Sequence, residues 1–294
     1  MKKNLYILCI SLIASYGYGN AIYEILNISN NSKFLSLSGG GLSLSGNLSN
    51  NPASEKVSKK ETFNISLLSY PEAIYSTHIN YTKNISKYMI TFNFVNLNYG
   101  DLRKNGINIG KSNENFISIA AKGHFKKLIS YGSQLGFVHS KIGSYNSSAI
   151  TADLGIRFHI ISKSFGIGMA IKNIGYQINS YSNINENLPS SIKVGLHYKP
   201  SKLPAILTYD RSYFINTKYI INVVGIIYTL GDFSFLFSAS DNYNDLKMNN
   251  YKNDILAGIG CGLGFKLSKG EIILGYKSHG IAGDIIGITI KKYF

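Results

Sequence analysis

The chain has 294 residues with 22 tyrosines, 15 phenylalanines, 29 glycines and no tryptophan, and it carries a formal net charge of +15 at only 15% charged residues. Two cysteines are too few for a disulfide-stapled secreted domain, so that class is excluded. No block of lysine and arginine with interleaved aromatic residues occurs, which argues against a nucleic-acid partner.

Residues 1–21 have the pattern of a cleaved secretory signal peptide. Two lysines precede the apolar run Leu5–Ala14, and the small-residue stretch Gly17–Ala21 follows it. The run is shorter than the roughly 20 residues of a membrane-spanning helix. We therefore expect an exported protein. Its mature part would keep one cysteine, Cys261, and would form no intramolecular disulfide.

Residues 22–60 are small and polar, with too little bulk for a core of their own. Their landmarks are a triple glycine and an Asn-Pro-Ala sequence, which comprise Gly39, Gly40, Gly41, Asn51, Pro52 and Ala53. Such a segment is either a disordered leader or a plug inside a barrel, where a close approach to the wall needs small side chains. The composition of the segment leaves both alternatives open.

Residues 61–294 contain a succession of short segments rich in Ile, Tyr, Phe, Val and Thr, separated by turn residues. We expect about 14 strands, an even number as bacterial single-chain barrels require, with lengths near those of tilted membrane strands. The predicted strands are 62–69, 73–83, 87–99, 114–126, 131–142, 150–161, 165–174, 191–199, 204–213, 219–229, 232–241, 254–266, 271–279 and 285–294.

The connections between these segments alternate in length. Every other connection is short, whereas the intervening ones are mostly longer, especially 99–114, 175–190 and 241–254. Short periplasmic turns and long external loops are typical of outer-membrane barrels, and a soluble sandwich has no reason to alternate in this way. The sequence therefore predicts an all-β, transmembrane, antiparallel barrel in a bacterial outer membrane.

The last predicted strand ends in a pattern typical of barrel insertion. Ile288, Ile290 and Phe294 share one face of this strand. A terminal phenylalanine after alternating apolar residues resembles the signal that the barrel-insertion machinery reads, so we expect that machinery as a partner. Lys292 interrupts the apolar face and would have to extend to the interface.

A glycine run in the segment 254–266 places Gly258, Gly260, Gly262 and Gly264 on one strand face. Strict alternation on a strand is not the glycine-rich turn that binds dinucleotides. The glycines form either a smooth inner wall, against which a plug or a ligand packs, or a bend in the barrel; the wall interpretation is slightly favoured.

Chemistry-bearing residues are scattered. The six histidines lie on separate segments without metal-ligand spacing, and no serine sits in a strained nucleophile turn, so we expect no metal, no cofactor and no enzyme. The positive charge has two interpretations. It attracts outer-membrane lipid, lipopolysaccharide phosphates or an acidic partner, or it reflects lysine and asparagine usage in an AT-rich genome.

Several motifs resemble those of FadL-type barrels, and in particular the PorV/PorQ family. The resemblance covers nearly the whole mature chain, through the order and spacing of motifs that are weak one by one. They are the triple glycine 39–41 with Asn51-Pro52-Ala53, Asn98–Asp101 with Gly106 and Gly110, Ala152–Ile156, Ile171–Gly175, Leu188-Pro189, Val194–Tyr198, Pro204 and Asp210.

The resemblance implies a 14-stranded FadL-type barrel over residues 61–294, with a short plug in 22–60. Family relatives serve the type IX secretion system as partners that hold secreted or surface-attached proteins. This implies docking through the external loops, with Tyr99, Asp101, Tyr181 and Tyr243 as candidate contacts. The alternative is a FadL-like transporter of small hydrophobic molecules, which should have an apolar lumen with a lateral opening. A plain porin is a third candidate, against which the plug argues.

Overall fold

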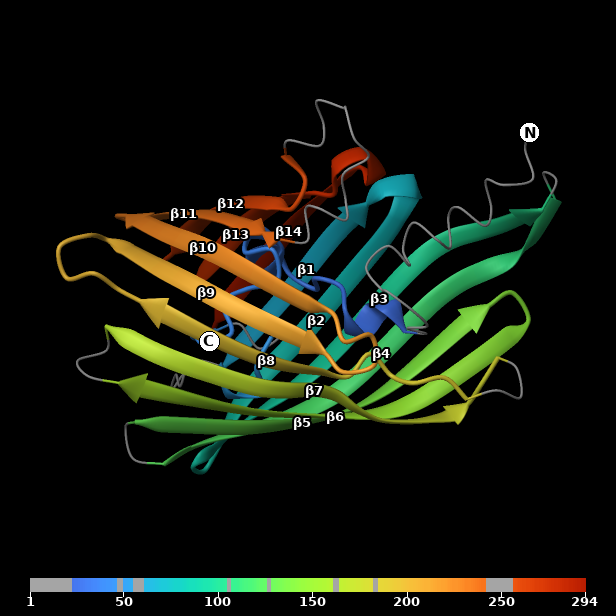
Figure 1. Ribbon diagram of the computed structural model, residues 1–294, viewed down its shortest axis with the longest axis horizontal. Coiled ribbons are helices and arrows are strands. Elements are labelled where there is room, and N and C mark those ends of the chain that lie inside the picture. Colours follow the sequence, from blue (N-terminus) through green and yellow to red (C-terminus); the bar gives the residue numbers. More distant parts are fainter. Residues whose placement is uncertain are drawn as a thin grey trace.

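The computed structural model describes residues 23–46, 50–54, 61–104, 107–125, 128–160, 164–181, 185–241 and 256–294. These residues form fourteen strands (Figure 1). The strands are β1 (Thr62–Tyr70), β2 (Ile74–Ile85), β3 (Tyr88–Lys104), β4 (Ile107–Phe125), β5 (Ile129–Ile142), β6 (Tyr145–Ile160), β7 (Phe165–Asn179), β8 (Ser191–Tyr198), β9 (Ala205–Phe214), β10 (Ile220–Leu230), β11 (Phe233–Ser240), β12 (Ile259–Leu267), β13 (Gly270–Ser278) and β14 (Asp284–Tyr293).

The strands close into one barrel, in which each strand pairs with its neighbours in sequence and β1 pairs with β14. All these pairs are antiparallel, and Thr62 of β1 lies opposite Tyr293 of β14. The Phe294 amide donates a hydrogen bond to the Glu61 carbonyl at 3.0 Å, so both ends of the barrel sheet lie on the same side. The predicted all-β barrel and its strand number are confirmed.

Side chains alternate between the lumen and the outside along each strand. On β5, Leu135 and Phe137 are 60% and 43% exposed, whereas Val138 is fully buried. An apolar residue that a barrel exposes on its outer face contacts lipid rather than water. The exposed large apolar side chains include Leu67, Phe92, Ile117, Leu135, Leu154, Met169, Val224, Phe237, Leu274 and Ile286.

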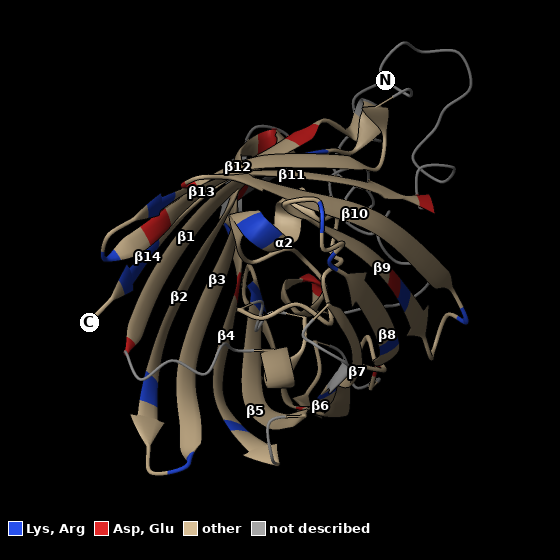
Figure 2. Cartoon of the chain, turned by 90° about the vertical axis from the view of Figure 1, so that its left-hand side faces the viewer, with Lys and Arg blue, Asp and Glu red and all other residues tan. Residues whose placement is uncertain are grey.

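The amino-terminal segment lies inside the barrel, as Figure 2 shows. Its short helices are η1 (Glu24–Leu26), α2 (Ser32–Ser36) and η2 (Pro52–Ser54). Helix α2 contacts β11 to β14, η2 contacts β4 to β6, and η1 contacts β3 and β4. No helix in the described part of the chain has the length and hydropathy that a bilayer crossing needs.

The barrel has one tall side and one short side (Figure 1). Strands β3 to β7 have 14 to 19 residues, whereas β8 to β14 have 8 to 11. We call β3 to β7 the tall wall. They run beyond the neighbouring strands on the side opposite Phe294, which we take as the external side because chain ends of such barrels lie in the periplasm.

The predicted external loop 99–114 is wrong, because most of these residues continue the paired strands β3 and β4. Asn98 pairs with Asn113 and Asp101 with Lys111, with a register shift between the two pairs. The prediction missed this extension because a strand that rises above the bilayer has water rather than lipid outside. Polar residues therefore replace the apolar alternation there. The predicted length asymmetry of the connections is correspondingly weaker than expected.

Candidate functional site: the plugged lumen

The inner plug, which we define as Ser32–Gly46 with Asn50–Ser54, rests on glycines of the barrel wall. A Cβ atom added at Gly132 of β5 would lie 2.5 Å from the Pro52 carbonyl carbon. A Cβ at Gly275 of β13 would lie 2.6 Å from the Ser32 carbonyl oxygen. Real Cβ atoms do not approach backbone so closely, so these positions accept glycine alone. The glycine floor consists of Gly132, Gly155, Gly168, Gly195, Gly260, Gly262 and Gly275.

The structure divides the four predicted lumen-wall glycines. A Cβ at Gly260 would lie 2.8 Å from the Ser36 carbonyl oxygen, and one at Gly262 would lie 2.7 Å from the Ser36 Cβ, so both face helix α2. Gly264 faces no plug residue, since the nearest atom to its added Cβ is Ser234 Cβ at 3.4 Å. Gly258 precedes β12 at φ +78, a turn conformation that favours glycine.

A buried carboxylate holds the triple glycine. The Asp210 side chain on β9 accepts hydrogen bonds from the Gly41 amide at 2.6 Å and the Leu42 amide at 2.8 Å. Gly39 and Gly41 have φ values of +90 and +83, and a Cβ at Gly40 would lie 2.9 Å from an Asp210 carboxylate oxygen. The three glycines therefore form a tight turn pressed against the wall, with Asp210 as its anchor.

The Asn-Pro-Ala sequence and two wall residues fix the other end of the inner plug. The Asn51 side-chain nitrogen, Nδ2, donates to the carbonyl of Ile156 on β6 at 3.3 Å, and the Asn51 side-chain oxygen accepts from the Ala53 backbone amide at 2.8 Å. The Arg157 Nε atom donates to the Ser43 carbonyl at 2.7 Å. Pro52 is itself buried against the floor at Gly132. Both predicted plug motifs thus contact the wall.

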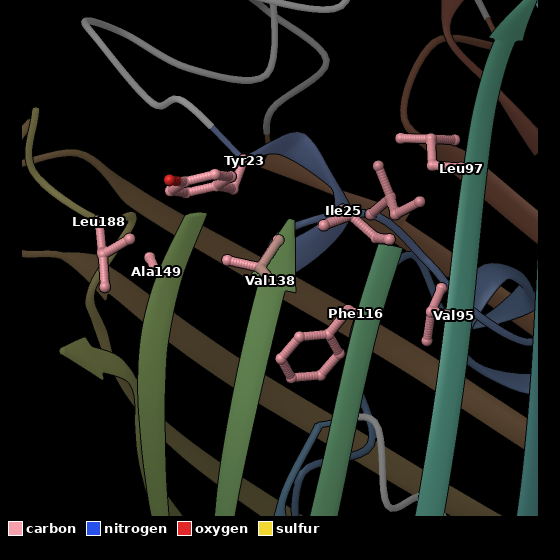
Figure 3. Packing of buried hydrophobic residues seen from close by; sticks show 9 residues of the cluster. Tyr23, Ile25, Val95, Leu97, Phe116, Val138, Ala149 and Leu188 are labelled. Atoms are coloured by element: carbon pink, nitrogen blue, oxygen red, sulfur yellow. The ribbon is translucent and has the colours of Figure 1, made fainter. Parts of the chain in front are cut away.

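The outer plug, which we define as Tyr23–Ile28, is held by apolar packing instead. Figure 3 shows Tyr23 and Ile25 against side chains of the tall wall. Tyr23 is fully buried and Ile25 is 4% exposed. The apolar cluster consists of Tyr23, Ile25, Ile28, Val95, Leu97, Phe116, Val138, Ala149 and Leu188. Leu188 belongs to the external connection 180–190 and packs on the outer plug from there.

A hydrogen-bond network ties the outer plug to the tall wall and to that same connection. The Glu114 carboxylate on β4 accepts from the Ile25 amide at 2.8 Å and from the Ser140 hydroxyl at 3.3 Å. The Tyr181 hydroxyl donates to Ser140. The Tyr23 hydroxyl and the Ser147 hydroxyl lie 2.6 Å apart. The outer plug and the connection 180–190 therefore share partners on β4 to β6.

A second acid, Glu24, lies beside Glu114 in the outer plug. Burial raises the pKa of the Glu24 carboxyl to about 8, and the negative charge of Glu114 acts in the same direction. The Glu24 Oε2 atom is closed off from solvent and has no hydrogen-bond partner among the described residues. Both causes favour the neutral, protonated carboxyl while the outer plug is seated.

Described plug and wall residues enclose cavities, two of which have volumes of about 40 and about 70 Å³ and share Asn27, Phe34 and Lys193 in their lining. The Lys193 ammonium lies 3.5 Å from the Asn50 side-chain oxygen. The larger cavity is also lined by Lys277, and none of the described residues that line it is a carboxylate. Its lining combines these lysines with apolar side chains such as Phe34.

The predicted docking residues are in different environments. Tyr99 packs on the apolar cluster of the outer plug, so its assignment to an external contact is corrected. It points into the barrel because strand alternation places it on the same face of β3 as Val95 and Leu97, which are buried. Asp101 is exposed, and Tyr181 is half-buried on Ser140. Tyr243 lies outside the described residues.

The predicted insertion residues lie on the outer face of β14. Ile288, Ile290 and Phe294 are 36%, 45% and 60% exposed, and the Lys292 ammonium lies 4.8 Å from the centre of the Phe294 ring. Their recognition by the insertion machinery stays a prediction. No group of three or more potential metal-ligating side chains occurs in the described segments.

Sequence reasoning missed the plug-anchoring roles of Asp210, Glu114 and Arg157. Each contacts a plug residue 89 to 169 positions away in the chain. The sequence analysis includes Asp210 only as part of a family-like motif. The available signal for an anchoring role was a carboxylate on the inner face of a membrane strand, where an ionisable residue needs a partner.

The fold of this chain is similar to that of solved outer-membrane barrels. No family model matches the chain, and no curated protein matches it in sequence. The crystal structure of the toluene transporter TodX from Pseudomonas putida matches with a TM-score of 0.56 at 10% identity, covering 90% of this chain and 97% of TodX. A deltaS2 mutant of the TodX monoaromatic hydrocarbon channel matches with a TM-score of 0.59 at 9% identity, covering 90% of this chain and 99% of the mutant.

Identities this low speak to the fold alone. That fold supports the expected outer-membrane location, whereas signal-peptide cleavage and the domain boundaries at 21 and 60 stay predictions. The PorV/PorQ resemblance is likewise still an expectation from the sequence. The chain has the fold of the FadL-like outer-membrane β-barrels.

Proposed function

We propose that this protein is a closed outer-membrane barrel that serves as a docking and assembly component for protein secretion or surface attachment, in the manner of the PorV/PorQ family. The observation that carries the proposal is the closure of the barrel. The wall is hydrogen-bonded all the way round, and plug helices contact it on both sides of the lumen, α2 on β11 to β14 and η2 on β4 to β6. A closed wall around a seated plug is better suited to present a surface than to conduct.

The surface that such a partner would meet is the external end of the tall wall. The β3–β4 and β5–β6 hairpins reach this end, and Asp101 and Tyr145 are exposed close to it. Paired strands hold these side chains more rigidly than a long loop would. A rigid outer edge lowers the entropy cost of binding a folded partner.

The test is affinity capture from solubilised outer membranes, with the tagged full chain as bait. The matched variant replaces residues 102–110 by Asn-Gly, which joins Asp101 to Lys111 by a two-residue turn across a pair already in register. We expect the full chain to recover secretion or surface-attachment proteins and the shortened hairpin to lose them. Heat-modifiable migration on gels checks that the variant still forms a barrel.

Recovery of no such protein by the full chain, together with a hydrophobic molecule co-purifying at stoichiometric level, would contradict docking. That result would favour the second candidate, a FadL-like transporter of small hydrophobic molecules. The specific support for transport is the likeness in fold to TodX, a toluene transporter. Transport would require the plug to move, because its helices pack on the wall on both sides of the lumen.

A further inference from the structure

On β3 to β5, the outer face of the tall wall changes abruptly from apolar to polar at one level. Phe94, Ile117 and Phe137 lie side by side on β3, β4 and β5 and are 37%, 59% and 43% exposed. One step further along the same face, Asn96 lies beside Asn115. Asparagine facing hydrocarbon is costly, so this step is the external boundary of the lipid-facing band.

Above this boundary lies an array that we call the amide shelf. Its members share the outward face of β3 to β5 and comprise Asn96, Asn98, Asn113, Asn115, Lys111 and Lys141. The amides are held in place by each other. The Asn96 side chain donates to the Asn115 side-chain oxygen at 2.9 Å, and Asn115 donates to Asn113 at 3.1 Å. Neighbouring strands are about 4.8 Å apart, so the shelf is roughly 10 Å wide.

The two lysines of the shelf are neighbours on adjacent strands. Lys141 pairs in register with Asn113, two residues from Lys111, and diagonal pairs of this kind have Cα atoms roughly 7–8 Å apart. Both lysines are exposed. Asp101 lies opposite Lys111 on the far side from Lys141, so one carboxylate faces two cations. Like charges so placed repel each other, and an anion between them removes the repulsion.

We propose that the amide shelf binds lipopolysaccharide, the phosphorylated glycolipid of the outer leaflet. Its acyl chains lie on Phe94, Ile117 and Phe137, a phosphate lies at Lys111 and Lys141, and its sugar hydroxyls bond to the amides above the boundary. This arrangement follows from the continuity of the shelf with the lipid-facing band and from the complementary charge. It adds a lipid contact to the proposed docking role and does not depend on it.

The test measures binding of diphosphorylated lipid A to the detergent-purified full chain by native mass spectrometry. The variant is Lys111→Gln with Lys141→Gln. The control, Lys199→Gln with Lys202→Gln, makes the same charge change at exposed positions of the opposite, periplasmic end. We expect the shelf variant to weaken lipid A binding roughly tenfold or more, and the control to change it by less than about twofold.

A second variant, Asn113→Asp, adds a carboxylate between the lysines. It should weaken the binding of diphosphorylated lipid A and leave the binding of dephosphorylated lipid A unchanged. Equal losses in the shelf and control variants would overturn the proposal, as would equal affinity for the two forms of lipid A. In cells, a photoreactive residue at position 141 should cross-link to lipopolysaccharide. Cross-links to a protein alone would assign the shelf to a protein partner instead.

Discussion

The inner and outer plug are held in the same barrel by different forces. The inner plug lies backbone-to-backbone on wall glycines such as Gly132, and buried polar groups such as Asp210 fix its turns. The outer plug is held as the core of a small soluble protein is, by apolar side chains such as Ile25 against the tall wall. Adding a side chain to a wall glycine should therefore disturb the inner plug, whereas truncating a buried apolar side chain should disturb the outer plug.

This difference indicates that the two parts can separate. The outer plug shares its partners with the external connection 180–190, through Tyr181, Ser140 and Glu114. The inner plug has its contacts with wall residues nearer the periplasmic end, such as Gly168 and Asp210. A partner that pulls on the external connection would therefore loosen the outer plug while the inner plug keeps the lumen shut. The following substitutions test this division.

The largest effect is expected from Gly260→Val on the glycine floor. The added Cβ would lie 2.8 Å from the Ser36 carbonyl oxygen, so the inner plug must shift or leave. Overpacking costs about 1–3 kcal/mol or more. Because this clash is with the plug backbone, it displaces the inner plug and opens the lumen, whereas the truncation of Ile25 loosens the outer plug alone. We expect the plug to become accessible to protease and the conductance in planar bilayers to rise, in a barrel that is still heat-modifiable.

The control is Gly264→Val on the same face of the same strand, where the nearest atom to the added Cβ is 3.4 Å away. It should leave protease resistance and conductance close to those of the parent chain. If both valines open the barrel equally, contact with the plug is not what requires glycine at position 260, and the bend interpretation of the glycine run is the better one.

The next largest effect is expected from Ile25→Ala in the outer plug. Ile25 is 4% exposed within the apolar cluster, and truncating such a residue costs about 2–5 kcal/mol of local stability. Hydrogen exchange should accelerate over Tyr23–Ile28 and stay unchanged around Gly41. The control is Leu135→Ala, which removes the same apolar bulk from the lipid face of β5. Acceleration at Gly41 would show that the two plug parts open together.

The sequence predicts most of the fold because the membrane imposes it. Lipid on one side forces the alternation that marks the strands, and Gly260 and Gly262 are readable from the same period. The sequence does not reveal the part of the tall wall beyond Tyr99. Water lies outside the strands there, so outward positions hold Asn or Lys and the apolar alternation that marks a strand is absent. The site was missed where contacts join distant residues. Gly41 and Asp210 are 169 positions apart, and Ser43 and Arg157 are 114 apart, and no local pattern links them.

A smaller, pH-dependent effect is expected at Glu24. Burial raises the pKa of this carboxyl to about 8 in the seated state, from the ordinary value of 4.5 that applies when the segment is released. A raised pKa means that seating favours the protonated form. The stabilisation is complete below about pH 4.5 and is lost as the pH rises towards 8. Exchange over Tyr23–Ile28, corrected for intrinsic rates, should increase about tenfold or more across this window.

Glu24→Gln keeps the shape of the side chain and removes its charge, so exchange in this variant should depend much less on pH. Glu61→Gln is the control, because Glu61 is an exposed acid beside Lys83 and Tyr81 at the periplasmic end. Titration of Glu114, the acid that contacts the outer plug beside Glu24, would leave a residual dependence. An undiminished dependence in Glu24→Gln would assign the effect to Glu114.

The smallest effect is expected from Tyr23→Phe. The substitution removes the hydrogen bond between the Tyr23 and Ser147 hydroxyls and keeps the buried ring. Ser147 retains Gln177 at 2.7 Å and the Asn179 carbonyl at 2.8 Å, so no buried polar group loses its last partner. The cost should therefore be about 0.5–1.5 kcal/mol of local stability, measured as exchange over Ile25–Ile28. Tyr75→Phe, on the exposed outer face of β2, should change nothing in that segment. A loss as large as that of Ile25→Ala would mean that the polar network, rather than the apolar cluster, holds the outer plug in place.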